Sequence, residues 1–177
     1  MKLSTRKKAS IAGGIVLALV VVGILLAWTK PWTLFTTVQV NEVSAVDEYL
    51  STSPTPPTTD EPEVAAPVLA YDGVFQSQGN YSVEGTVTII ELPDGQQILT
   101  LDGFKSTNGP DLQVVLATDA GNVKQGQHLS LGALKGNEGT QNYEIPAGVD
   151  VSAFTLISIW CDDFASPFGY ADLVKPS

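Results

Sequence analysis

The fold is decided by Val83–Phe104, which reads VEGTVTIIELPDGQQILTLDGF. In its first half, apolar or small residues alternate with a glutamate and two threonines, and successive side chains of a β-strand point to opposite faces of a sheet. Pro93-Asp94-Gly95 then leads through a turn into a second apolar run, Gln97–Phe104. Two such runs joined by a short turn with glycine predict a β-hairpin.

Beyond this hairpin, short apolar runs continue between Gly, Asn and Pro residues, with no long stretch of helical periodicity. Short strands at such spacing are typical of an antiparallel β-sandwich or an open barrel. We therefore predict one all-β domain over residues 69–177. Its further strands are expected at Leu112–Leu116, Gln141–Ile145, Thr155–Cys161 and Ala171–Val174.

The N-terminal part contains one long uncharged apolar run, Ile11–Ala27. Extended to residues 9–28, it would cross most of a hydrocarbon core of roughly 30 Å as a transmembrane helix, with the bilayer as its partner. The basic residues before it favour a cytoplasmic tail at residues 1–8 and an extracytoplasmic β domain, so the expected location is the cell membrane with a single pass. The sequence Leu25-Leu26-Ala27-Trp28 is a poor peptidase site, which favours a retained anchor over a cleaved leader.

Two segments connect the anchor to the β domain. Residues 29–50 form a moderately apolar juxtamembrane segment, in which helical spacing from Val43 to Leu50, with Asn41 as a candidate cap, predicts a short helix near the membrane. Residues 51–68 are rich in Pro, Thr, Ser and acidic residues and hold little apolar surface to bury, so they are predicted to be a disordered linker.

Charge divides the chain into two regimes. Residues 1–30 hold five of the nine basic residues and none of the 19 acidic ones. The rest carries four lysines against all 19 acids, a net charge of −15. Such a domain repels a phosphate backbone, and its scattered lysines form no basic patch. Nucleic-acid binding is therefore excluded as a function class.

Cys161 is the only cysteine, so no internal disulfide can form. In its predicted strand its parity matches Ile157 and Ile159, which places its side chain on the apolar face, near Phe164 and Phe168. One interpretation is a small core residue, since free cysteine is among the most buried residue types. The other is a redox-active thiol or a ligand of a metal or haem iron, although burial disfavours the thiolate that would bind. Both interpretations stay open on the sequence.

Most cysteine-based centres are excluded by the residues available. Blue copper needs two His and commonly a Met beside the Cys, whereas this chain has one histidine, His128, and one methionine, Met1. Covalent c-type haem, zinc fingers and iron-sulfur clusters need further Cys or His residues. A noncovalent haem or an oxygen-rich metal site remains.

The other titratable residues are best interpreted as solvent-exposed residues without a catalytic role. His128 is interpreted as a solvated loop residue, and without a Gly-x-Ser-x-Gly elbow a hydrolase triad is disfavoured, so an enzyme is the least favoured class. Acidic side chains in the domain are taken as surface acids unless they ligate a hard cation. Those that would supply oxygen ligands are Asp102, Asp111, Asp162, Asp163 and Asp172.

Two glycine-containing loops carry the polar candidates for binding. Asn108-Gly109-Pro110-Asp111 precedes one predicted strand, and Lys135-Gly136-Asn137 precedes another without the helix that a phosphate loop requires. Turn chemistry alone explains both loops. Alternatively they form a recognition surface. Its binding residues would be Asn108, Asp111, Lys135 and Asn137.

Several of these segments together resemble one known family, the DM-thirteen (DM13) domain, also called the electron transfer DM-thirteen domain. The resemblance covers residues 69–177 in order and spacing. It implies a β-sandwich module of extracytoplasmic or membrane-linked proteins, in which a redox role has been proposed for the cysteine that matches Cys161. The segments that carry it are Gly109-Pro110-Asp111-Leu112, Leu134-Lys135-Gly136-Asn137, Gln141-Asn142-Tyr143-Glu144-Ile145-Pro146 and Ile159-Trp160-Cys161 with Phe164 and Phe168-Gly169.

Two hypotheses for function follow. In the first, the chain is a membrane-tethered redox or electron-transfer module in which Cys161 holds a noncovalent haem or a metal. In the second, it is a non-catalytic binding or adhesion module at the cell surface, in which Cys161 is structural and the two loops form the recognition surface. Tyr81 stands near the position where some family members have a histidine, which weakens the first hypothesis. The candidate walls of a cofactor site are Trp160, Phe164, Phe168 and Tyr143.

Overall fold

The hairpin predicted from the sequence forms the middle of the sheet. Strand β3 (Val83–Glu91) pairs antiparallel with β4 (Gln97–Ser106). In the turn between them the Gly95 N–H donates to the Leu92 carbonyl at 2.8 Å, and Gly95 has a φ of +85°, a backbone conformation that glycine adopts without strain. The hairpin prediction is confirmed.

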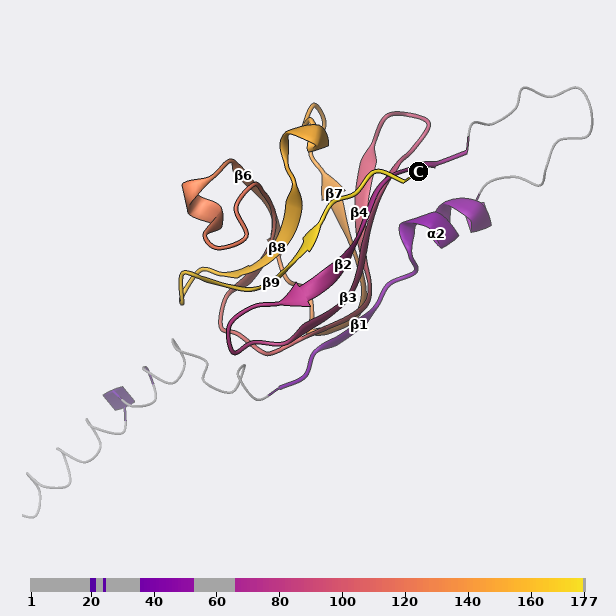
Figure 1. Cartoon of the computed structure of the whole chain (residues 1–177). Helices are drawn as coiled ribbons and strands as arrows, with labels where there is room; N and C mark the ends of the chain where they lie inside the picture. The colour runs from indigo at the N-terminus through magenta and orange to yellow at the C-terminus, as the bar shows by residue number, and fades with distance from the viewer. Residues whose placement is uncertain (1–19, 22–23, 25–35, 53–65, 177) are drawn as a thin grey trace, which may run out of the picture. The chain divides into compact units, whose positions relative to one another are not determined.

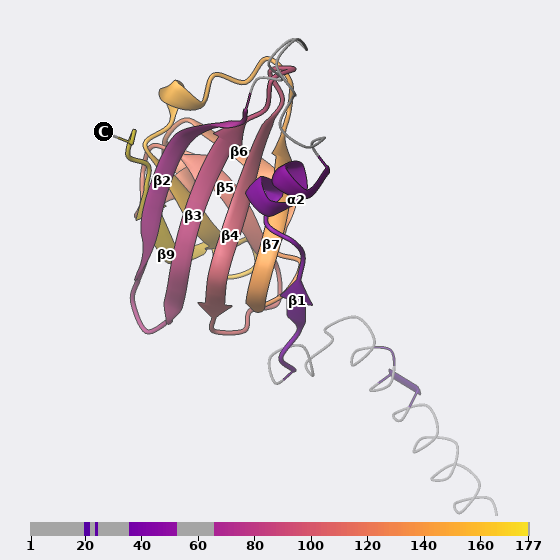
Figure 2. The same ribbon diagram turned by 90° about the vertical axis from the view of Figure 1, so that its right-hand side faces the viewer.

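All nine strands of the described residues belong to one curled sheet, in the order β1-β7-β4-β3-β2-β9-β8-β5-β6. Neighbours are antiparallel except β1 and β7, which run parallel. Figures 1 and 2 show the sheet curling so that β2, β3, β4 and β7 face β9, β8, β5 and β6. The other strands are β1 (Gln39–Asn41), β2 (Val68–Ser77), β5 (Leu112–Ala117), β6 (His128–Ala133), β7 (Glu138–Ile145), β8 (Leu156–Cys161) and β9 (Ser166–Asp172).

The all-β class is therefore confirmed, and the open barrel is the closer of the two predicted arrangements. A sandwich would hold two separate sheets, whereas here β2 connects both halves: its first part pairs with β3, and its last three residues pair with β9. The sheet is mixed and not purely antiparallel, because the short β1 adds to the edge of β7 in the parallel direction.

The main core fills the space between the two halves of the sheet, and alternation along each strand supplies it. Val87 and Ile89 of β3 and Leu99 and Leu101 of β4 have no exposed surface. A smaller apolar cluster covers the outer face of β5 and β8 and includes Val123 of the short helix η2 (Val123–Gln125). A second short helix, η3 (Val151–Ala153), precedes β8.

Three strands were not predicted, and one was displaced. Asp72-Gly73 interrupts the apolar residues of β2, β6 has only six residues and includes Gly132, and β1 has only three residues. β9 begins at Ser166, five residues before the predicted start, because a register shift beside Trp160 accommodates Pro167 within the strand. The predicted end at Val174 is reduced to an isolated bridge with Asp72.

A short helix is present where the sequence predicts one, but its cap differs. Helix α2 (Ala45–Thr52) is capped by Ser44, whose hydroxyl accepts from the Asp47 N–H at 3.3 Å and donates to the Asp47 carboxylate at 3.1 Å. The predicted cap, Asn41, is wrong because that residue ends β1. Ala45 is buried, and α2 lies beside β4 and β7 (Figure 2).

The computed structural model describes residues 20–21, 24, 36–52 and 66–176. Contacts divide the chain into one unit before residue 36 and a second that holds the sheet and α2. The predicted cytoplasmic tail, most of the predicted membrane helix and most of the linker lie outside the described residues. Val20, Val21 and Ile24 of the predicted anchor are helical and exposed. Among the described residues, no helix has the length and hydropathy needed to cross a bilayer.

Candidate functional site

Cys161 ends β8 and lies inside the main core. Its side chain has no exposed surface, and it shares one face of the strand with Ile157 and Ile159, as the alternation predicts. The neighbouring strands place Leu112 and Ser166 opposite it. A thiol in this position is closed to solvent and to dissolved reagents.

Two of the four predicted aromatic walls, Phe168 and Tyr143, belong to the same core cluster as Cys161. Phe168 is fully buried in the same cluster, and its ring stacks on Tyr81 with 3.7 Å between centroids. Phe164 is 50% exposed and stacks on Phe168 at 6.4 Å. Gly109 permits the close approach of its loop, because an added Cβ would lie 2.9 Å from the Phe168 ring. These aromatic rings therefore run from the core to the surface.

Trp160 lies on the opposite face of β8, in the smaller cluster, because adjacent residues of a strand alternate. Its indole N–H donates to Asp162 Oδ1 at 3.0 Å, and the same oxygen pairs with Lys124 Nζ at 2.6 Å. The hydrogen bond from Lys124 lowers the pKa of Asp162, burial opposes that effect, and the Trp160 hydrogen bond adds to it. Trp160 and Cys161 do not face a common space.

A metal ion held by Cys161 together with His128 does not fit the described residues. His128 begins β6 opposite Ala117, whereas Cys161 pairs with Leu112 at the other end of β5. Five residues of extended strand separate the two positions by about 17 Å, so His128 and Cys161 cannot share an ion. No group of three His, Cys, Asp or Glu side chains in the described part of the chain could hold a metal.

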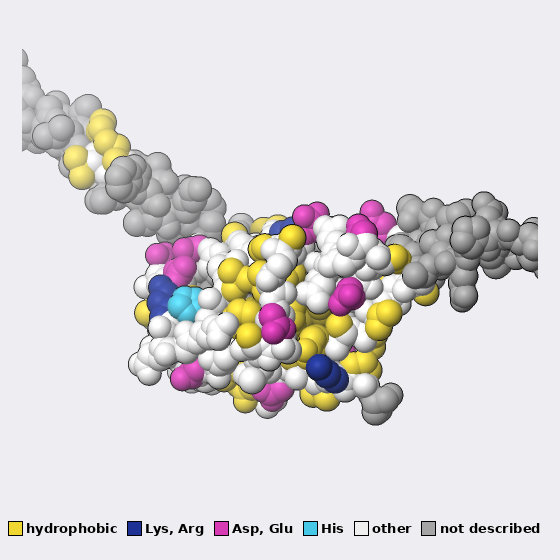
Figure 3. All heavy atoms as spheres, turned by 90° about the horizontal axis from the view of Figure 1, so that it is seen from above, with side chains coloured by type: hydrophobic (Ala, Val, Ile, Leu, Met, Phe, Trp, Pro, Cys, Tyr) yellow, Lys and Arg dark blue, Asp and Glu magenta, His cyan; other side chains and the backbone are white. Residues whose placement is uncertain are grey.

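The other predicted ligands are dispersed over the surface. Asp102 accepts from the Thr140 hydroxyl at 2.7 Å, and Asp111 accepts from the Gln113 amide at 2.8 Å. Figure 3 shows acidic side chains scattered over one face and the single histidine at the surface beside a basic side chain. His128 is exposed, with Nδ1 3.1 Å from the Gly126 carbonyl oxygen. These residues do not form a common site.

A buried polar network organises the Lys135 loop instead. Gln141 has no exposed surface, and its Oε1 accepts from the N–H groups of Lys135 and Gly136 at 3.1 and 3.2 Å, while its Nε2 donates to the Gly136 carbonyl at 2.7 Å. The Tyr143 hydroxyl donates to the same Oε1 at 2.9 Å and accepts from the Lys135 N–H at 3.0 Å. The Tyr143 hydroxyl therefore holds this loop.

The outer side of this loop holds the extended segment Thr36–Val43. Asn137 Oδ1 accepts from the Val38 N–H at 2.6 Å, and Asn108 Nδ2 donates to the Thr36 carbonyl at 3.1 Å. Asn142 Nδ2 donates to the Val43 carbonyl at 2.7 Å. Side chains from two loops and one strand of the β domain thus bind the main chain of a segment far away in sequence.

Glu42 is the charged contact of this segment. Lys135 Nζ lies 2.8 and 3.0 Å from its two carboxylate oxygens, and the Asn142 N–H donates to Oε2 at 2.7 Å. Burial would raise the pKa of Glu42, but the hydrogen bonds from Lys135 and Asn142 and the charge of Lys135 outweigh it and lower that pKa. Burial raises the pKa of Tyr143 to about 12. The hydrogen bond from the Lys135 N–H opposes this rise, and the charge of Glu42 adds to it.

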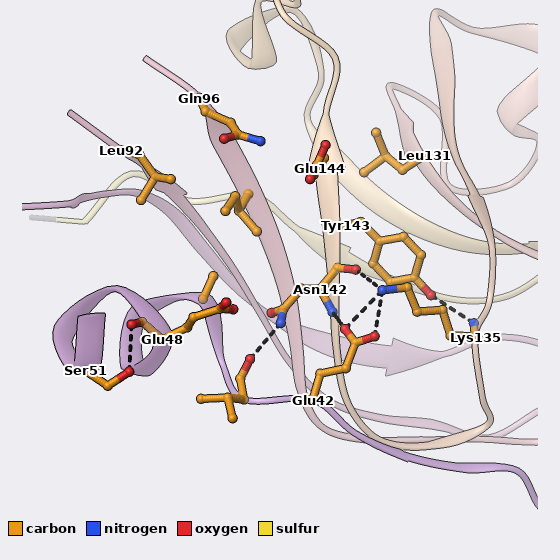
Figure 4. A pocket seen from close by; sticks show the side chains of 13 residues that line it. Glu42, Glu48, Ser51, Leu92, Gln96, Leu131, Lys135, Asn142, Tyr143 and Glu144 are labelled. Atoms are coloured by element: carbon orange, nitrogen blue, oxygen red, sulfur yellow. Dashed lines mark hydrogen bonds and ion pairs between the residues drawn. The ribbon is translucent and has the colours of Figure 1, made fainter. Parts of the chain in front are cut away.

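A cavity of about 1,090 Å³ opens beside these contacts, between α2 and the ends of β4 and β7 (Figure 4). Its walls mix apolar side chains such as Leu92 and Leu131 with the carboxylates of Glu48 and Glu144. Two smaller cavities, of about 590 and 510 Å³, lie elsewhere on the sheet. Cys161 and its aromatic neighbours line none of the three.

The structure therefore brings together three of the four predicted binding residues, Asn108, Lys135 and Asn137, and leaves Asp111 to bond Gln113. Sequence reasoning missed Glu42, because its partner is 93 residues away in the chain. The alternation of Val38, Val40 and Glu42 on one side of an extended segment was the available signal.

The fold and these contacts define a small all-β module with a sealed thiol and a polar sheet edge. A family model described as Electron transfer DM13 matches residues 74–173, and the chain belongs to this family. The resemblance inferred from the sequence is confirmed over those residues, and the family description supports a redox-related module at most. No curated protein and no solved structure matches the chain.

Proposed function

We propose that this chain is a membrane-anchored, extracytoplasmic DM13 module that acts by binding, with Cys161 as a structural core residue. The observation that carries the proposal is the convergence of polar side chains on one sheet edge beside a cavity of about 1,090 Å³, while the thiol is buried in the core. Concave sites with a few convergent polar groups are the usual places for ligands.

The anchor and the location rest on the sequence. The apolar run at residues 11–27 has the length of a membrane span, and the basic residues before it favour an N-terminus in the cytoplasm. The acidic β domain then lies outside the cytoplasm.

Electron transfer is the second candidate, and two observations favour it. The family description names it. The stacked rings of Tyr81, Phe168 and Phe164 extend from the cluster that contains Cys161 to an exposed position. In that role Cys161 would be the redox-active or ligand residue, for which the described residues offer no second ligand.

One experiment separates the two candidates. The full chain is purified from its native host, and its visible spectrum and iron and copper content are recorded beside those of Cys161→Ser. Binding without a redox centre predicts a colourless, metal-free protein whose variant differs only in stability. A visible band or a stoichiometric metal that the substitution removes would overturn the proposal in favour of electron transfer.

A further inference from the structure

The edge of β7 is shaped to receive a strand at very close range. An added Cβ at Gly136 would lie 2.5 Å from the Val38 carbonyl oxygen and 2.6 Å from Val40 Cγ2. An added Cβ at Gly139 would overlap the Val40 carbonyl. Glycine at these two positions therefore allows the backbone of β1 to approach, and its pairing places Val40 opposite Gly139.

The same edge recognises main-chain groups that any extended segment offers. Glu138 N–H donates to the Val38 carbonyl at 3.3 Å, and the Glu42 N–H donates to the Thr140 carbonyl at 3.0 Å. Asn137 and Asn142 bind one main-chain N–H and one carbonyl through their side chains, at 2.6 and 2.7 Å. Addition of a strand to a sheet edge is a common mode of peptide recognition.

Selectivity comes from one charged position. Lys135 Nζ, the Asn142 N–H and the Tyr143 ring, whose centroid is 5.1 Å from Nζ, surround the place taken by the Glu42 carboxylate. A carboxylate held by an ammonium group and a backbone N–H makes charge-assisted hydrogen bonds, which are stronger than neutral ones.

The edge of β7 lies within the residues that match the family model, whereas the segment bound to it lies outside them. Asn108, Lys135, Gly136 and Asn142 all lie within the matched residues 74–173, whereas the bound segment precedes them. The β domain therefore carries a strand-binding edge that is complete without the segment now bound to it.

We propose that the edge of β7, with Lys135, Asn137 and Asn142, is a receptor site for an extended polypeptide segment that carries a glutamate. In this chain Thr36–Val43 fills it in cis and is displaced by a segment of the same chemistry from another polypeptide. The inference rests on the proposed binding function and names the class of partner. Because a tethered ligand competes at a high effective concentration, a free segment binds only when the tether is cut or the partner is abundant.

The test uses the full chain with an N-terminal affinity tag and a protease recognition sequence inserted between residues 57 and 58. The chain is captured by its tag and cut, and the fraction of the β domain that stays on the resin is measured. We expect the cut β domain to be retained and then released by a synthetic peptide of residues 36–44. The peptide with Glu42→Gln should release the domain only at an about tenfold higher concentration, which is the ratio that corresponds to one charge-assisted contact.

Variants make the result specific. Gly136→Ala adds only the Cβ that meets Val38 and Val40, and Glu42→Gln changes the ligand without altering the β domain, so both should release the cut domain. Gly121→Ala and Glu84→Gln are matched controls, because the nearest atom to a Cβ at Gly121 is a side-chain oxygen at 3.3 Å and Glu84 is exposed. Thermal unfolding of each uncut variant identifies any that fail to fold.

The inference is overturned if the wild-type domain elutes as soon as it is cut, if no peptide concentration releases it, or if Gly136→Ala and Glu42→Gln are retained like their controls. A metal-dependent visible spectrum lost with Cys161 would instead overturn the proposed function, so the two failures are distinguishable.

Discussion

At the scale of single residues, Cys161 connects the two candidate functions. A hydroxyl placed in its apolar surroundings would have no hydrogen-bond partner supplied for it, so Cys161→Ser should lower the free energy of unfolding by about 2 kcal/mol. Cys161→Ala leaves a small void and should cost about 1 kcal/mol. Urea denaturation measures both values. A serine variant as stable as the wild type, or rapid labelling of the native thiol by a thiol reagent, would contradict the core assignment.

Gln141 is the residue on which the Lys135 loop depends. Gln141→Met keeps the approximate shape but removes the acceptor of the Gly136 N–H and the donor to the Gly136 carbonyl, whereas the Lys135 N–H keeps the Tyr143 hydroxyl as its acceptor. Each unpaired buried group costs about 1–3 kcal/mol, so the substitution should destabilise the domain by about 3 kcal/mol or more. Gln97→Met, on a side chain of β4 that bonds only Glu91, is the control and should change stability little. Equal denaturation midpoints for the two variants would show that the network is dispensable.

At the scale of elements, the docking of β1 should depend on pH through Glu42. Its pKa is lowered from the ordinary value of 4.5, so its contribution is complete above that value and is lost as pH falls through the lower value of the docked state. Retention of the cut β domain on tagged resin should therefore decrease as pH is lowered from about 5 to about 3. Wild-type retention that stays constant over this pH range would contradict the assigned ion pair.

The elements also show how far the sequence could predict this molecule. Alternation located β3, β4, β5, β7 and β8, because each has a buried face and an exposed or oppositely packed one. It also placed Cys161 on the face of Ile157 and Ile159. Alternation could not locate β1, whose three residues acquire their strand conformation from a partner about a hundred residues away. The same separation in sequence is why Glu42 was not predicted. It is also why the loop residues were predicted to bind an unknown ligand, although they bind a segment of their own chain.

At the scale of the whole molecule, the proposed anchor would determine where binding occurs. The full chain expressed in its host should remain in the membrane pellet after carbonate extraction. Replacement of Val20 and Val21 by arginine should move it to the supernatant, since each arginine at the centre of a membrane helix costs about 2.5–3.5 kcal/mol on insertion scales. Wild-type protein in the carbonate supernatant would contradict the proposed anchor.

The most direct test of the central claim is the hydrogen exchange of the Glu42 backbone amide in the full chain, measured by NMR. If residues 36–43 occupy the edge of β7, this amide donates to Thr140 and should exchange at least about tenfold more slowly than in an unstructured chain, and Gly136→Ala should restore fast exchange. Exchange of the wild-type amide at the unstructured rate would show that the edge does not hold the segment.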